Sequence, residues 1–167
     1  MKKLFLALAL SAAACLAGCS DNEEIGYDIG SKVLIPKNGL QQVALTADAA
    51  AIDYEVWIYR SGYNEGGSTA ALSVDAEALA AYNNANGTAY VLMPEACYDL
   101  PTAAVRLDNN AHTAKIGIRI DVSAITADSR CVLPVSVGSP DTEVNAAAAT
   151  VLIFPVRPTT EKPENAQ

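Results

Sequence analysis

The sequence is poor in the side chains on which many enzymes and nucleic-acid-binding proteins depend. It has one histidine, and its 11 lysines and arginines are outnumbered by 19 aspartates and glutamates. No basic cluster follows Lys2 and Lys3, which argues against binding to nucleic acid through its phosphates. The apolar run over residues 4–14 is shorter than the about 20 residues that a membrane-spanning helix needs. No repeat of fixed period is present, which excludes a solenoid.

The N-terminus has the form of a secretory signal. A short basic region, Met1-Lys2-Lys3, precedes the apolar run. The next residues, Leu16-Ala17-Gly18-Cys19, resemble the bacterial lipobox, in which a peptidase cuts before a cysteine that carries a diacylglycerol. Stable attachment to a membrane takes at least two acyl chains. We therefore predict a lipoprotein signal peptide over residues 1–18 and a lipid anchor on Cys19. The alternative is an ordinary secreted protein with a free thiol at Cys19.

The acidic stretch Ser20–Glu24 resembles the surface-export signal of lipoproteins from Bacteroides-like Gram-negative bacteria. We expect an outer membrane lipoprotein that is exposed at the cell surface, with residues 19–30 as a lipid-anchored acidic tether. The alternative is that these residues are only a solvated linker. Loss of Lys2 and Lys3 with the signal would change the net charge from −8 to −10, and an acidic chain of this kind stays soluble.

Two cysteines remain for the folded part. Cys15 leaves with the signal and Cys19 carries the lipid, which leaves Cys97 and Cys131. A pair of cysteines in an exported protein is a disulfide candidate, and closing a loop of about 35 residues would contribute roughly 3–4 kcal/mol. The alternative is that both are small buried side chains that never meet, because the sequence does not place their Cα atoms.

Alternation of apolar and polar residues predicts β-strands through most of the remaining chain. The clearest strand is residues 51–60, where one face carries Ile52, Tyr54, Val56 and Ile58 and the other carries Asp53, Glu55, Trp57 and Tyr59. Residues 114–121 and 131–137 show the same pattern, and Pro134 indicates an edge position or a bulge for the second of these. One short helix interrupts the strands, with Asp75 as its cap and Gly87 at its end.

About eight short strands with one short inserted helix predict an all-β fold, an antiparallel two-sheet sandwich over residues 31–157. Residues 158–167 form a polar tail. The absence of strand–helix alternation argues against a parallel α/β sheet.

The helix exit carries the most specific motif of this segment, Tyr82-Asn83-Asn84-Ala85-Asn86-Gly87-Thr88-Ala89-Tyr90-Val91-Leu92-Met93-Pro94. It resembles the Tyr-Asn-x-x-Asn-Gly-Thr-x-Tyr-x-x-Leu-Pro signature of the domain of unknown function 1735 family. The later Val132-Leu133-Pro134-Val135 resembles that family's Tyr-Val-Leu-Pro-Val strand, and the likeness covers roughly residues 31–157.

The resemblance implies an immunoglobulin-like sandwich at the N-terminus of a Bacteroides-type surface lipoprotein. Met93 replaces the usual leucine and Cys131 the usual tyrosine, and Cys97 directly precedes the matching Tyr98, which favours pairing of the two cysteines. In relatives the module often precedes a glycan-binding or endoglycosidase domain. The Asp-x-x-Asp-x-Asp-x-Glu signature of those endoglycosidases is absent, so the resemblance implies no catalytic residues here.

The candidate catalytic and metal-binding residues fit a structural explanation better. Asp53 and Glu55 lie about 7 Å apart by strand geometry, which could suit acid–base work on a glycoside but equally describes a solvated strand face. His112 has no neighbouring nucleophile. The run Asp108-Asn109-Asn110 lacks the length of a calcium loop and is expected to form a turn. We predict no catalytic residue, no metal site and no cofactor.

The feature with binding potential is aromatic. Trp57 and Tyr59 share the expected outward face of one strand, and Tyr63 follows in a glycine-rich loop. Aromatic rings offer flat apolar area with a polar edge, which suits stacking on sugar rings. The alternative is that Trp57 and Tyr59 point inward or are covered by the helix.

These features together predict a non-catalytic cell-surface module. It would bind or scaffold, with a role accessory to glycan capture as the leading interpretation. Its partners would be the membrane, through the lipid, and a glycan or other surface lipoproteins. The alternative is a structural or adhesion subunit that associates through a sheet edge.

Overall fold

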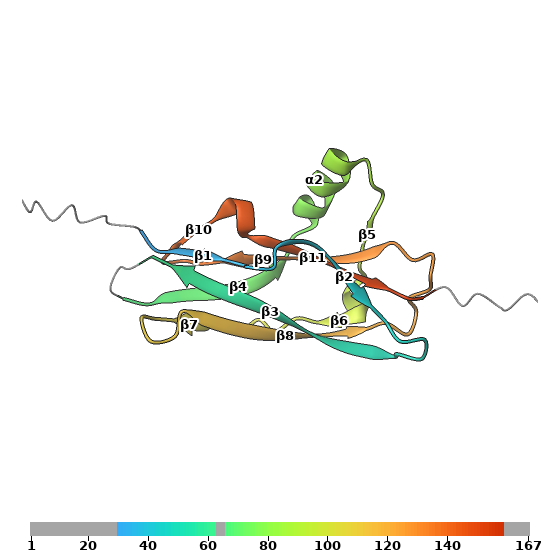
Figure 1. Ribbon diagram of the computed structural model, residues 1–167, viewed down its shortest axis with the longest axis horizontal. Coiled ribbons are helices and arrows are strands. Elements are labelled where there is room, and N and C mark those ends of the chain that lie inside the picture. Colours follow the sequence, from blue (N-terminus) through green and yellow to red (C-terminus); the bar gives the residue numbers. More distant parts are fainter. Residues whose placement is uncertain (1–29, 63–65, 159–167) are drawn as a thin grey trace, which may run out of the picture.

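The computed structural model describes residues 30–62 and 66–158. The predicted signal peptide, Cys19, nearly all of the tether, Tyr63 and most of the polar tail lie outside these residues. The described chain forms two β-sheets that pack face to face as an elongated sandwich (Figure 1). The predicted all-β immunoglobulin-like sandwich is therefore confirmed, with eleven strands in the described ranges, several of them only two or three residues long.

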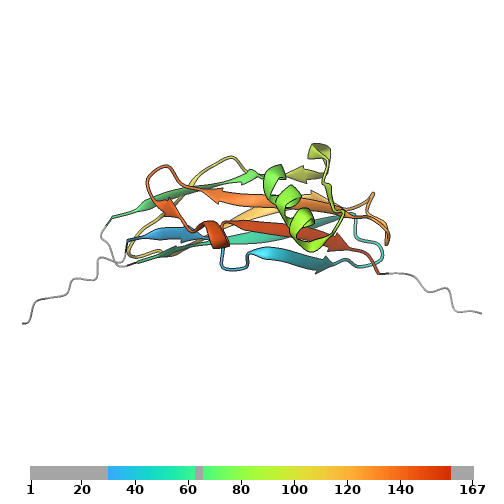
Figure 2. The same cartoon turned by 90° about the horizontal axis from the view of Figure 1, so that it is seen from above.

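The first sheet has five strands. In spatial order these are β10 (Glu143–Val144), β1 (Lys32–Leu34), β3 (Ala51–Ser61), β8 (Thr113–Asp121) and β6 (Tyr98–Asp99). The second sheet has the order β2 (Gly39–Ala44), β11 (Thr150–Val156), β9 (Cys131–Gly138), β4 (Ser68–Val74) and β7 (Val105–Leu107), and β5 (Val91–Leu92) pairs with β9. The described chain enters at one end of the sandwich and leaves at the opposite end (Figure 2).

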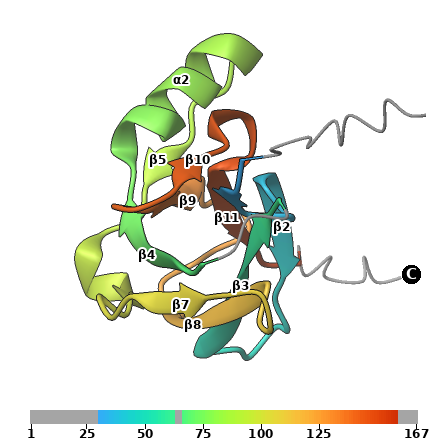
Figure 3. The same ribbon diagram turned by 90° about the vertical axis from the view of Figure 1, so that its left-hand side faces the viewer.

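The helix α2 (Ala76–Asn86) lies outside the second sheet and packs on β9 (Figure 3). Leu79 of the helix joins Val132 and Leu152 in a small apolar cluster on the outer face of that sheet. Two short 3-10 turns, Glu95–Cys97 and Ala146–Ala148, complete the elements. Within the described ranges no helix combines the length and apolar character needed to cross a bilayer.

The core lies between the sheets and follows the predicted alternation. Side chains of β3 and β8 that face the second sheet are buried, whereas their neighbours in sequence are exposed. The least exposed members of this core are Val33, Ile58, Ala70, Leu107, Ile118, Ile120, Val122, Leu133, Val135 and Ile153. Period-two alternation on the inner faces of two sheets is what produces a continuous dry layer.

The motif at the helix exit is structural. The Asn83 side chain donates to the Tyr90 carbonyl at 2.9 Å and accepts from the Tyr90 amide at 3.0 Å and the Thr88 hydroxyl at 2.8 Å. Gly87 ends the helix at φ 63°, a left-handed conformation that costs glycine little. At the other end the Asp75 carboxylate accepts from the Ala78 amide at 2.9 Å, which confirms the predicted cap.

Strand pairing differs from the antiparallel expectation in three places. The pairs β1–β10, β2–β11 and β5–β9 are parallel. Parallel partners cannot be joined by a tight hairpin, so they come from distant parts of the chain. The turn between β1 and β2 carries the chain from the first sheet to the second.

Pro134 occupies a central strand, so its predicted edge or bulge position is wrong. Strand β9 pairs with β11 on one side and with β4 and β5 on the other. Pro134 lies where β4 has ended and β5 has not yet begun, and its carbonyl accepts from the Asp75 amide at 3.1 Å. The N–H that proline lacks would point to the same side, into the gap between β4 and β5, so no ladder hydrogen bond is lost.

Candidate functional site

The outward face of the five-stranded sheet carries the exposed aromatic side chains. Trp57 is 44% exposed and Tyr59 is 37% exposed, both on β3. The helix lies against the other sheet and leaves them uncovered. The predicted outward orientation is therefore confirmed for these two residues, whereas Tyr63 lies outside the described residues.

Strand β8 supplies the other half of this face. The register places Lys115 opposite Trp57, Gly117 opposite Glu55 and Arg119 opposite Asp53. We call this surface the Trp57 face, defined by the outward residues Asp53, Glu55, Trp57, Tyr59, Thr113, Lys115, Gly117 and Arg119. The alternation over residues 114–121 puts Lys115 and Arg119 on one face of the strand, and the register shows which β3 side chain each one meets.

Charges on the Trp57 face are paired across the strands. The Lys115 Nζ lies 2.7 Å from a Glu55 carboxylate oxygen, and it also lies 5.6 Å from the centroid of the Trp57 ring. The Arg119 guanidinium lies 3.5 Å from an Asp53 oxygen. All four charged side chains are half-exposed or more. Each ion pair therefore contributes about 0–1 kcal/mol to the stability of the fold, and a ligand can replace one of its partners at little cost in free energy.

The same pairing weakens the case for acid–base catalysis. An acid–base pair on a glycoside needs one carboxyl group held protonated near neutral pH, which takes an apolar environment. Asp53 and Glu55 are both exposed, and each lies beside a cation, so neither has the apolar surroundings that such a carboxyl group needs. His112 is exposed at the turn before β8 and is not near them in the strand register. No set of three or more potential metal-ligating side chains is found in the described part of the chain.

Gly117 leaves a notch in the middle of the Trp57 face. It lies between two long side chains on β8, and a methyl group built on its Cα would have no atom within 4 Å. Glycine in a strand interior weakens the strand and often marks a place where another molecule approaches closely. The notch is therefore open space on the Trp57 face between Lys115 and Arg119.

A shallow hollow adjoins the same face beyond Arg119. It has a volume of about 190 Å³ and is lined by Ala96, Cys97, Tyr98, Asp99, Arg119 and Asp121. We call it the Asp99 hollow. Asp99 lies opposite Arg119 in the β6–β8 register, so the hollow continues the row that includes Asp53.

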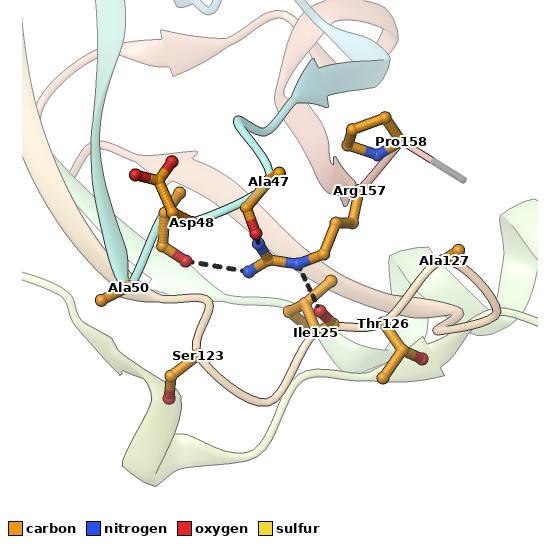
Figure 4. A pocket seen from close by; sticks show the side chains of 10 residues that line it. Ala47, Asp48, Ala50, Ser123, Ile125, Thr126, Ala127, Arg157 and Pro158 are labelled. Carbon is orange, nitrogen blue, oxygen red and sulfur yellow. Dashed lines mark hydrogen bonds between the residues drawn. The ribbon is translucent and has the colours of Figure 1, made fainter. Parts of the chain in front are cut away.

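A larger hollow, of about 550 Å³, lies at the end of the sandwich where the described chain leaves (Figure 4). Its floor is the guanidinium of Arg157, which donates to the carbonyls of Thr46, Ala47, Ala49, Val122 and Ile125 at 2.5–3.1 Å. All five N–H groups of an arginine are thereby used. The hollow offers no spare cation, and Arg157 acts as a clasp that holds two loops and the end of β11 together.

A second polar cluster lies at the opposite end. The Asp141 carboxylate accepts from the Thr69 amide at 2.9 Å and from the Ser139 hydroxyl at 2.9 Å. These hydrogen bonds, that of the Thr69 amide first, lower the pKa of Asp141 to about 2. Beside it the buried Arg60 donates to the Ser68 hydroxyl at 3.1 Å. The cluster binds the ends of β3, β4 and β9 to one another and has a structural role.

The two cysteines of the folded part are both free and half-buried in the structure. Both pack against the main core, Cys97 from the 3-10 turn before β6 and Cys131 from the first residue of β9. The structure holds both as free thiols packed against the core, and a disulfide between Cys97 and Cys131 stays a prediction.

Comparisons with known proteins place the chain in a family. The profile of a family described as an N-terminal domain matches residues 29–144. No curated protein matches the chain in sequence. A candidate carbohydrate binding protein from Bacteroides ovatus ATCC 8483 superposes with a TM-score of 0.68 at 16% identity, over 76% of this chain and 37% of that protein.

Two further solved structures share the fold. A multidomain protein including domain of unknown function 1735, from Bacteroides ovatus, gives a TM-score of 0.57 at 16% identity, over 76% of this chain and 45% of that protein. EndoBT-3987 of Bacteroides thetaiotamicron, solved with a Man5GlcNAc product, gives a TM-score of 0.59 at 18% identity. The match covers 75% of this chain and 30% of that protein. This chain thus spans less than half the length of each of the three proteins.

Proposed function

This chain belongs to the family of N-terminal domains that includes domain of unknown function 1735, and we propose that it is a non-catalytic glycan-binding module of a bacterial surface lipoprotein. The single observation that carries the proposal is the exposure of Trp57 on the outward face of the first sheet. The Trp57 face combines the apolar area of two aromatic rings with hydrogen-bonding groups on either side of them.

The exposure of Trp57 needs an explanation because tryptophan has the largest of the apolar side chains. Burying an aromatic side chain of 150–250 Å² is strongly favourable, yet this one, the only tryptophan, is left 44% exposed. An exposed apolar patch with polar side chains around it is typical of a binding site. Stacking of a sugar ring would remove that apolar area from water, while neighbouring carboxylates and cations bond to its hydroxyl groups.

The names of two structural relatives agree with a glycan as the ligand class. One is described as a candidate carbohydrate binding protein, and the other was solved with an oligosaccharide product. Their identity to this chain is low, so they support the ligand class by analogy of fold, and the Trp57 face supplies the specific argument.

We place the module at the outer face of the outer membrane, attached through lipid on Cys19. The basis is the lipobox-like Leu16-Ala17-Gly18-Cys19 and the acidic stretch after it. Replacement of Cys19 by serine would remove the acceptor sulfur, so the precursor would stay unprocessed and lose its fatty-acid label. Metabolic labelling with a tagged fatty acid, followed by cell fractionation, tests this directly; an equal label on the Cys19→Ser variant would overturn it.

A glycan array tests the binding function. The full chain in detergent micelles is applied to neutral oligosaccharides, including Man5GlcNAc, alongside Trp57→Ala and Tyr59→Ala variants. We expect binding by the native chain and a loss of about tenfold or more, or roughly 1.4 kcal/mol, for Trp57→Ala. Thermal unfolding of the variants serves as the control for folding. Binding that survives Trp57→Ala unchanged would place the site elsewhere.

A structural or adhesion subunit is the second candidate, and the short edge strand β5 favours it. Its Val91 and Leu92 are 58% and 40% exposed, and among the described residues only β9 pairs with it. An exposed apolar edge is a template for pairing with another chain. Sedimentation of the full chain over a range of concentrations, compared with a Val91→Lys variant, separates the two: reversible association lost in the variant would favour adhesion.

A further inference from the structure

Three features of the first sheet lie in a row. They are the exposed ring of Trp57, the notch above Gly117 and the Asp99 hollow. In the β3–β8 register, Gly117 is the diagonal neighbour of Trp57, and Arg119 follows Gly117 on the same side of β8. Diagonal cross-strand neighbours are about 7–8 Å apart, and next neighbours on one strand face are about 7 Å apart. The three features thus form a path across β8.

We infer that this path binds an uncharged oligosaccharide that runs across β8, with one sugar ring stacked on Trp57, the next unit over the notch at Gly117 and the following unit in the Asp99 hollow. The inference rests on the proposed glycan-binding function and adds the direction of the chain, the position of a second subsite and the charge class of the ligand.

Gly117 gives the second subsite its room. Any larger side chain at this position would stand between Lys115 and Arg119 and complete the layer that covers the sheet. The open space found above Gly117 brings a bound ring close to the sheet surface. Glu55 lies directly across from Gly117, so its carboxylate is placed to accept from a hydroxyl group of the unit bound there.

Lys115 is the movable part of the path. Its amine is shared between Glu55 and the Trp57 ring, and both contacts are at exposed positions. Contacts of this kind are weak, so a sugar ring can displace the ammonium from Trp57 while Lys115 keeps its ion pair. The displaced amine then remains beside the ligand as a hydrogen-bond donor.

The charges along the path select against acidic glycans. Two cations, Lys115 and Arg119, are each paired with a carboxylate of β3. The Asp99 hollow adds two more carboxylates, Asp99 and Asp121, and Lys37 lies beside Trp57 and Glu55 as a third cation. Three cations and four carboxylates give the path a net charge of −1. The whole chain carries −8. A uronate or sulfated sugar would meet net repulsion here, whereas hydroxyl groups find carboxylate acceptors and cationic donors.

The test uses a variant that fills the notch without touching the ring. In Gly117→Val the new side chain occupies open space in a strand, so it is expected to leave the melting temperature unchanged or raise it. Gly138→Val is the matched control, because Gly138 also lies in a strand with open space around its Cα and belongs to the other sheet. The full chain and both variants, together with Trp57→Ala, are titrated with Man5GlcNAc, cellotetraose and a uronic acid tetrasaccharide.

We expect a neutral probe to bind, Gly117→Val to weaken that binding about tenfold or more, and Gly138→Val to bind as the native chain does. Binding is expected to change little between about 0.05 M and 0.5 M salt, because no net charge on the ligand is screened. Native affinity in Gly117→Val, or a preference for the uronate, would overturn the inference. In either case a loss of binding in Trp57→Ala would still support the proposed glycan-binding function. If none of the probes binds, the inference and the proposed function fail together.

Discussion

The amine of Lys115 lies 5.6 Å from the centroid of the Trp57 ring and 2.7 Å from a carboxylate oxygen of Glu55. Lys115, on β8, thus partly covers the exposed ring of Trp57 and is also paired with Glu55, which lies on β3 with Trp57. A contact of an exposed ammonium with an aromatic ring contributes about 0.5–1 kcal/mol, and an exposed ion pair about 0–1 kcal/mol. The cover is therefore weak enough for a ligand to displace.

Replacement of Lys115 by alanine tests how weak the cover is. We expect the free energy of unfolding to fall by less than about 1 kcal/mol and the fluorescence of Trp57 to shift to longer wavelength, since the ring becomes more exposed to water. Lys32→Ala is the control, because Lys32 pairs with Glu143 at 2.7 Å in the same sheet without a ring contact. A loss of stability well above that of Lys32→Ala would show that Lys115 holds the sheet together.

Replacement of Arg157 by methionine is expected to be far more costly. The side chain keeps much of its length but loses all five hydrogen bonds of the guanidinium. Of the five carbonyls, those of Thr46 and Val122 still accept from backbone amides. We expect the free energy of unfolding to fall by about 3 kcal/mol, as measured by urea denaturation. The matched control is Arg130→Met, at an exposed arginine for which the described residues give no side-chain hydrogen bond. Equal losses of unfolding free energy in the two variants would contradict the structural role assigned to Arg157.

The motif at the helix exit depends on the Asn83 side chain. Asn83→Ala removes one donor and one acceptor that together satisfy the Tyr90 backbone and the Thr88 hydroxyl. We expect a loss of about 2–3 kcal/mol, whereas Asn84→Ala, at the exposed neighbouring position, should change stability by less than about 0.5 kcal/mol. Thermal or urea unfolding of both variants decides the matter. An unchanged free energy of unfolding in Asn83→Ala would contradict the structural role assigned to the motif.

The acid stability of the fold should depend on Asp141. Hydrogen bonds lower the pKa of this carboxyl from 3.8 to about 2 in the folded protein. A group whose pKa is depressed on folding stabilises the fold above the unfolded value, and this contribution disappears as the pH falls from 3.8 to about 2. Asp141→Asn should therefore be less stable than the native chain at neutral pH and approach it in acid.

Urea unfolding of the native chain and of Asp141→Asn at about pH 7, 4 and 2.5 measures this difference. The control is Asp128→Asn, at an exposed aspartate for which the described residues give no side-chain hydrogen bond. A stability difference between native and Asp141→Asn that stays constant over this range would contradict the assigned role of the carboxylate.

Much of the fold could be predicted because the local signals agree with the final structure. The alternation in β3 and β8 correctly separated inward from outward side chains, and Asp75 and Gly87 marked the two ends of the helix. These signals depend on neighbours within a few residues. The outward orientation of Trp57 followed from them as well.

The pairing of distant strands could not be predicted in the same way. Pro134 suggested an edge because a proline N–H is missing, yet its strand is central and the gap arises only where β4 is replaced by β5. The clasp of Arg157 depends on carbonyls of loops more than thirty residues away in sequence. The notch at Gly117 likewise becomes a feature only when the register places it beside Trp57 and Glu55.

The most direct measurement uses the fact that Trp57 is the only tryptophan in the chain. Its fluorescence reports on the proposed site without any label. Titration of the full chain with neutral oligosaccharides such as Man5GlcNAc should shift the emission to shorter wavelength with a saturable dependence on sugar concentration, and Gly117→Val should move the midpoint to higher concentration. Saturable glycan binding in an independent assay, together with an emission spectrum that does not change, would show that Trp57 is not part of the site.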